Sequence, residues 1–75
     1  MTLDPDALEP LYAQLADLLR GQIERGELTG RVPSAKTLAQ QHEVSNGTAE
    51  RALAILRDEG VIASAIGRGH FVVRR

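Results

Sequence analysis

Residues 34–59 read Ser-Ala-Lys-Thr-Leu-Ala-Gln-Gln-His-Glu-Val-Ser-Asn-Gly-Thr-Ala-Glu-Arg-Ala-Leu-Ala-Ile-Leu-Arg-Asp-Glu, and this stretch decides the fold. Ser34 and Ser45 each precede a run whose apolar residues recur at helical spacing, and a serine hydroxyl at such a position caps the first turn of a helix. His42-Glu43-Val44 separates the two runs. The stretch therefore predicts a helix over about residues 35–41, a tight turn, and a second helix that runs from the Ser45 cap to the end of the stretch.

The residues after this stretch have the pattern of a β-hairpin. Residues 61–65 and 70–73 have the composition of short strands, and Ile66-Gly67-Arg68-Gly69 between them holds the glycines that a hairpin turn needs. We expect Phe71, at an apolar position of the second strand, in the core. A helix-turn-helix followed by a hairpin is typical of a winged helix, which places one helix in the major groove of DNA and the hairpin against the backbone.

The residues before the stretch predict one longer helix. Pro10 suits its first turn, and Gly26 suits the position just after its last turn. We expect Tyr12 and the leucines of this helix in the core, and Arg31-Val32 as a very short strand. The predicted apolar face consists of Leu11, Leu15, Leu18, Leu19 and Ile23. The fold class is thus mainly α with a small β-hairpin, a three-helix winged helix-turn-helix.

Length and composition limit the chain to one small domain. Seventy-five residues leave room for a single hydrophobic core, and we expect a loose N-terminal lead-in over residues 1–9 and the domain over residues 10–75. The chain has no cysteine and two histidines far apart in sequence, a composition that excludes disulfides and argues against a metal site. No apolar run approaches the roughly 18 residues of a membrane span, and we expect no signal peptide, cofactor, metal or membrane partner.

The net charge of −1 conceals an uneven distribution. Residues 1–30 hold two arginines against six carboxylates, a balance of −4, whereas residues 31–75 hold seven basic residues against four carboxylates, a balance of +3. An acidic half and a basic half favour a polarised molecule whose basic side meets phosphate. No group of side chains has the spacing of a catalytic site, so we do not expect an enzyme.

Motifs along most of the chain resemble a known family. Over about residues 10–73 the chain is similar to the N-terminal winged-helix domain of the GntR family of bacterial transcription regulators. The motifs that carry the resemblance are Pro10-Leu11-Tyr12, Gly26-Glu27-Leu28, Val32-Pro33-Ser34, Leu38-Ala39, Val44-Ser45-x-x-Thr48, Ala52-Leu53, Glu59-Gly60-Val61-Ile62 and Gly67-Arg68-Gly69-x-Phe71-Val72. The resemblance implies a cytoplasmic, nucleoid-associated bacterial protein that binds a palindromic operator as a homodimer, with one half-site per subunit.

The helix caps and the resemblance together predict which residues contact DNA. The first turn of the helix over 35–41 offers free N–H groups and Lys36 to phosphate. The next helix reaches base edges, where Asn46 can pair with adenine, Gly47 permits close approach, and Arg51 can reach phosphate or guanine. Arg68 at the hairpin tip can contact the backbone or the minor groove. The predicted DNA-binding residues are Ser34, Lys36, Thr37, Ser45, Asn46, Gly47, Thr48, Arg51, Gly67, Arg68, Gly69 and His70.

The chain departs from the family pattern in several places. Asn46 and Glu50 stand where members usually carry basic residues, His42-Glu43 stands where they usually carry an apolar residue and glycine, and the loop before Pro33 is shorter. Members also carry a C-terminal effector or dimerisation domain, and this chain ends at Arg75 with no visible small-molecule site. Glu50 either accepts a hydrogen bond from a cytosine amine or repels the duplex.

These features favour sequence-specific binding of double-stranded DNA by a transcriptional regulator of the repressor type. Two alternatives remain open. The first is a winged helix that binds another protein, which predicts no salt-dependent affinity for DNA. The second is a structural DNA binder with little sequence preference, which predicts salt dependence but little difference between an operator and a random duplex.

Overall fold

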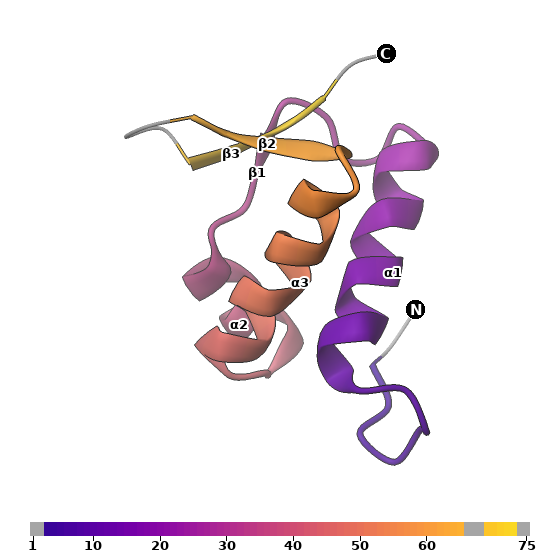
Figure 1. Cartoon of the computed structure of the whole chain (residues 1–75). Helices are drawn as coiled ribbons and strands as arrows, with labels where there is room; N and C mark the ends of the chain where they lie inside the picture. Colours follow the sequence, from indigo (N-terminus) through magenta and orange to yellow (C-terminus); the bar gives the residue numbers. More distant parts are fainter. Residues whose placement is uncertain (1–2, 66–68, 74–75) are drawn as a thin grey trace.

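A computed structural model describes residues 3–65 and 69–73 of the chain. Within these residues the bounds of the helices and strands are α1 Leu11–Glu24, β1 Arg31–Val32, α2 Ala35–His42, α3 Asn46–Asp58, β2 Ile62–Ala65 and β3 Gly69–Val72 (Figure 1). The predicted fold class is confirmed, because three helices and a small β unit follow one another in the order of a winged helix-turn-helix. None of the helices in the described part of the chain is both long enough and apolar enough to span a membrane.

The helix ends follow the predicted capping residues. Ser34 Oγ accepts a hydrogen bond from the Thr37 N–H at 3.2 Å, and Ser45 Oγ accepts one from the Thr48 N–H at 3.0 Å. These bonds satisfy N–H groups that a helix start leaves without a partner, so α2 and α3 begin directly after the two serines. Gly26, with φ of +75°, takes the left-handed conformation just after α1.

The turn between α2 and α3 contains a strained residue. Glu43 has φ of 55° and ψ of 45°, and it is the one non-glycine residue with positive φ in the described part of the chain. Its N–H donates to the carbonyl of Ala39, which ends α2. A residue with a Cβ in this left-handed region costs about 1–2 kcal/mol. At position 43 of this turn, glycine would adopt the same backbone conformation with less strain.

The β unit is a three-stranded antiparallel sheet with β3 in the middle. The predicted hairpin is present, since β2 pairs with β3 in the register Ser64 to His70 and Ala63 to Phe71. The predicted short strand joins it on the other side, where Arg31 pairs with Phe71. The sheet therefore connects the loop before α2 with the C-terminal end of the described residues.

The prediction for Phe71 was wrong. Successive side chains of a strand point to opposite faces, and Val72, the neighbour of Phe71 on β3, packs against the core while Phe71 does not belong to it. Tyr12, also expected in the core, is half-buried. The buried core in the described part of the chain consists of Leu15, Ala16, Leu18, Leu19, Val32, Leu38, Ala39, Ala49, Ala52, Leu53, Leu56 and Ile62.

Helix α3 is the centre of the assembly. It packs against α1, α2 and β2, and the sheet lies across the C-terminal ends of α1 and α3 (Figure 1). Arg20 on α1 reaches the residue after α3, donating from Nε and Nη2 to the two carboxylate oxygens of Glu59 at 2.8 Å each. The position of α3 is thus fixed by packing on several sides and by the bidentate ion pair between Arg20 and Glu59 at its C-terminal end.

The segment before α1 is tied to that helix. The Gln14 side chain donates to the carbonyls of Asp4 at 2.7 Å and Glu9 at 2.8 Å, and its oxygen accepts from the Asp4 N–H at 2.7 Å. Leu8, between these anchors, is fully exposed. Gln14 thus fixes both ends of this loop, while the division of the chain into residues 1–9 and 10–75 stays a prediction.

Candidate nucleic-acid interface

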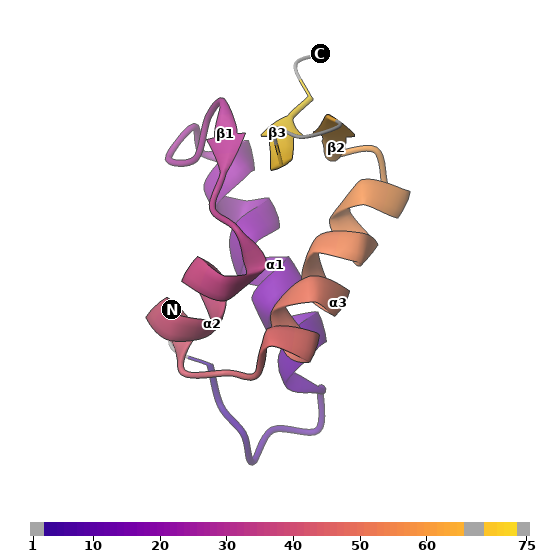
Figure 2. The same ribbon diagram turned by 90° about the vertical axis from the view of Figure 1, so that its left-hand side faces the viewer.

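One side of the molecule presents α2, α3 and the strands of the sheet. Figure 2 views this side directly, with α2 and β1 on one flank and α3 on the other. Both helices begin with a serine cap and exposed residues on this side. The first N–H groups of a helix carry partial positive charge, and a phosphate placed there gains hydrogen bonds.

A pocket with a volume of about 750 Å³ lies between α3, the start of α2, β1 and β3. We call this pocket the hollow. Its charged lining residues in the described part of the chain are Arg31, Glu50, Arg51 and Arg57. Three arginines against one glutamate give the lining residues a positive balance. The predicted polarity of the molecule therefore has a structural counterpart, because the hollow draws its arginines from the basic half of the sequence.

The predicted residues at the start of α2 lie at the edge of this side. Ser34, Lys36 and Thr37 are exposed. The Ser34 hydroxyl also donates to Thr37 Oγ1 at 3.0 Å, so the cap holds both hydroxyls in one cluster. Lys36 forms no ion pair with any residue that the structure describes. The geometry allows this turn to bind an anion through its N–H groups and one free ammonium group.

The start of α3 has the same construction. The Ser45 hydroxyl donates to Thr48 Oγ1 at 2.9 Å and caps the helix, and Thr48 is half-buried. Asn46 and Gly47 are exposed. A Cβ added at Gly47 would meet only Ser45 Oγ, at 3.9 Å, so the fold itself does not require glycine there. The role predicted for Gly47, close approach of DNA to the α3 backbone, stays a prediction.

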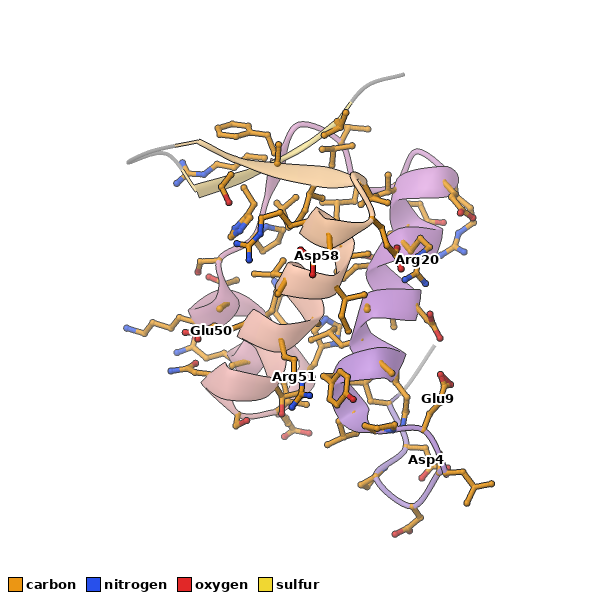
Figure 3. All side chains as sticks on the ribbon, viewed as in Figure 1. Asp4, Glu9, Arg20, Glu50, Arg51 and Asp58 are labelled. Carbon is orange, nitrogen blue, oxygen red and sulfur yellow. The ribbon has the colours of Figure 1, made fainter. Side chains whose placement is uncertain are left out.

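Arg51 and Glu50 differ in their surroundings although they are neighbours. The guanidinium carbon of Arg51 lies 4.4 Å from the centroid of the Tyr12 ring, so α1 holds this arginine by a cation–π contact (Figure 3). Glu50 is exposed, and it forms no ion pair with any described residue. Tyr12 therefore contacts an arginine of α3 through the face of its ring, which an assignment to the core did not capture.

The predicted wing residues are only partly within the described structure. Gly67 and Arg68 lie outside the described residues. Gly69 has φ of +85°, a conformation that glycine adopts without strain. His70 is half-buried and lines the hollow, and its Nε2 is covered and has no hydrogen-bond partner among the described residues. The beginning of β3 thus contributes a ring and a glycine with positive φ to the hollow.

Arg31 and Arg57 were missed as candidates from the sequence. Arg57 lies seven residues after Glu50, about two helical turns along the same side of α3, so helical spacing could have revealed it. Arg31 reaches the hollow because β1 pairs with the middle of β3. No local sequence signal announces that pairing.

Comparison with known proteins gives a consistent result. Residues 11–72 match the family model described as bacterial regulatory proteins, gntR family. The chain is 35% identical over 74 residues to the HTH-type transcriptional repressor NagR of Bacillus subtilis (strain 168). That match covers 96% of this chain and 30% of NagR, so the chain spans less than a third of this curated relative.

Two solved structures have the same architecture. YtrA from Sulfolobus acidocaldarius, a GntR-family transcription factor, superposes with a TM-score of 0.90 at 32% identity, over 99% of this chain and 80% of YtrA. AraR(DBD), solved in complex with operator ORX1, superposes with a TM-score of 0.84 at 28% identity, over 97% of this chain and 93% of AraR(DBD). With helices, sheet and family motifs all in agreement, the chain belongs to the gntR family of bacterial regulatory proteins.

Proposed function

We propose that this chain binds double-stranded DNA in a sequence-specific way and serves as the DNA-binding part of a bacterial transcriptional regulator of the repressor type. The observation that carries the proposal is the positively charged hollow beside the two capped helix starts, on one side of a gntR-family domain. The solved complex of the similar AraR(DBD) with an operator supports duplex DNA as the ligand. The similar NagR is a transcriptional repressor, which supports a repressor role, and we place that role in the cytoplasm.

In this proposal each element has a separate task. The N-terminal half of α3 enters the major groove, where Asn46 and its neighbours face base edges. The start of α2, with Ser34 and Lys36, binds a phosphate and sets the orientation of the domain. Arg31 and Arg57 neutralise the negative charge of the DNA phosphates that pass over the hollow. From its place in the sequence, Arg68 contacts the backbone or the minor groove beside α3.

Two copies are proposed to bind one palindromic operator. A standard interface buries about 800 Å² per partner, and a domain of this size has little apolar surface to spare for one. We therefore expect the isolated chain to be monomeric at tens of micromolar and to place two copies on half-sites about one helical turn apart. Sedimentation of the chain alone, and then with a palindromic duplex, measures both stoichiometries. A tight dimer without DNA would contradict this part of the proposal.

Selection of bound sequences from a random duplex pool tests the proposed function. We expect enrichment of one short half-site, repeated in inverted orientation at a fixed spacing. Binding without any enriched sequence would instead favour a structural DNA binder. No retention of duplex at low salt would favour a winged helix that binds another protein. Either of these outcomes overturns the proposal.

A further inference from the structure

Two exposed polar side chains in the first half of α3 are left without partners, and one of them, Glu50, lines the hollow. Asn46 and Glu50 are both exposed, and neither side chain forms a hydrogen bond or ion pair with any residue that the structure describes. They are four residues apart, so they project from α3 only about 40° from one another and about 6 Å apart along its axis. Figure 3 shows Glu50 on the α2 side of α3.

Two arginines near α3 have partners within the fold. Arg20 binds Glu59 through two contacts of 2.8 Å, and Arg51 lies over the Tyr12 ring. Glu50 lines the same hollow as Arg51 and Arg57, yet it forms an ion pair with neither. Its carboxylate is therefore free to accept hydrogen bonds from an outside donor.

A free carboxylate on this surface has a defined consequence for DNA binding. Two like charges 4 Å apart repel by about 1 kcal/mol in water and by more where water is excluded, so Glu50 weakens any complex in which it meets only phosphate. A carboxylate accepts hydrogen bonds and donates none. In the major groove only the amino groups of cytosine and adenine donate, whereas guanine and thymine present acceptors. Glu50 therefore selects an amino base and rejects the other two.

The two amino bases also differ from one another. Adenine carries its N7 acceptor next to the amino group, which repels the second carboxylate oxygen, whereas cytosine carries no acceptor there. A neutral amide such as that of Asn46 has one donor and one acceptor, and these match the N7 and N6 groups of adenine. Asn46 and Glu50 thus fit different bases, although both lie on one side of α3.

We propose that Asn46 and Glu50 are specificity-determining residues, and that Asn46 reads an adenine and Glu50 a cytosine of the same half-site. This inference rests on the proposed function and adds the base class that α3 recognises. Base pairs are stacked at 3.4 Å, so side chains about 6 Å apart along the helix reach bases about two steps apart. Gly47 lies between them in sequence and has no side chain to hold α3 away from the bases.

The test is a random-duplex selection with the wild-type chain and three variants. The wild type should enrich a half-site with adenine and cytosine within about two base-pair steps. Glu50→Gln, which replaces the carboxylate by an amide, should move the preference at the cytosine position to adenine. Asn46→Ala should lose the adenine preference only. Since a good side chain–base pair discriminates by about 1–3 kcal/mol, each preference should be worth about 5- to 150-fold in affinity.

Asp58→Asn is the matched control, because Asp58 is exposed on the same helix and its substitution changes the net charge as Glu50→Gln does. It should leave every base preference unchanged. A wild-type half-site without cytosine, or one whose cytosine preference persists in Glu50→Gln, overturns the inference and leaves the proposed function standing. No enriched sequence with any variant overturns the proposed function and the inference with it. Circular dichroism before selection should show the wild-type helix content for each variant, because all three substituted side chains are exposed.

Discussion

Replacing Glu43 by glycine should stabilise the domain. Glu43 holds φ of 55° and ψ of 45° in the turn between α2 and α3. Its Cβ costs about 1–2 kcal/mol in that conformation, whereas glycine loses about 0.5–1 kcal/mol through the greater freedom of the unfolded chain. The difference predicts a gain of about 0.5–1 kcal/mol in the free energy of unfolding. For a domain of this size such a gain raises the melting temperature by about 2–8 °C.

The assay is urea unfolding followed by circular dichroism, with two control variants at the same position. Glu43→Ala removes the charge but keeps a Cβ, so it should remain as strained as the wild type. Glu43→Asn should lie between the alanine and glycine variants, because asparagine tolerates the left-handed region better than other side chains. A glycine variant that is no more stable than the alanine variant would refute the reasoning from backbone strain, whatever the effect of the charge.

Three further predictions concern the packing and the charged contacts within the domain. Leu56→Ala, at a fully buried position of α3, should cost about 2–5 kcal/mol of the roughly 4–11 kcal/mol expected for the domain, measured by thermal and urea unfolding. Tyr12→Leu and Arg51→Met should couple by about 0.5–1 kcal/mol in a double-mutant cycle, and additive effects would exclude the cation–π contact. The hydrogen bond from Arg25 lowers the pKa of Glu27 below its usual value, so the ionised Glu27 adds stability above its unfolded-state pKa, and this stability is lost as the pH falls through the folded-state pKa. An NMR titration of Glu27 should have its midpoint below that of a glutamate without a partner, and the midpoint should rise in Arg25→Met.

The elements that depend on local chemistry could be predicted from the sequence. Ser34 and Ser45 mark the starts of α2 and α3 because a serine cap acts within one helical turn. Gly26 marks the end of α1 for the same kind of local reason. The candidate residues on these first turns follow directly, since a cap fixes where the next exposed residues begin.

The features that depend on tertiary contacts could not be predicted in this way. Phe71 was expected in the core because an apolar side chain on a short strand does not reveal which face is covered. Arg31 joins the hollow through pairing of β1 with β3, and that pairing links residues about forty positions apart in the chain. The contact of Arg51 with Tyr12 likewise joins α3 to α1. In each case the partner lies far away in the sequence, so no local pattern identifies it.

The salt dependence of binding to a duplex tests the central claim most directly. If each copy neutralises about three to five phosphates, the logarithm of the binding constant should fall against the logarithm of salt concentration with a slope of about −3 to −4.5 per half-site. Fluorescence anisotropy with a selected duplex and with a scrambled duplex of equal length measures this slope and the difference in affinity. The account predicts this slope with the selected duplex and clearly tighter binding to it than to the scrambled one at every salt concentration. A slope near zero, or equal affinity for the two duplexes, would contradict it.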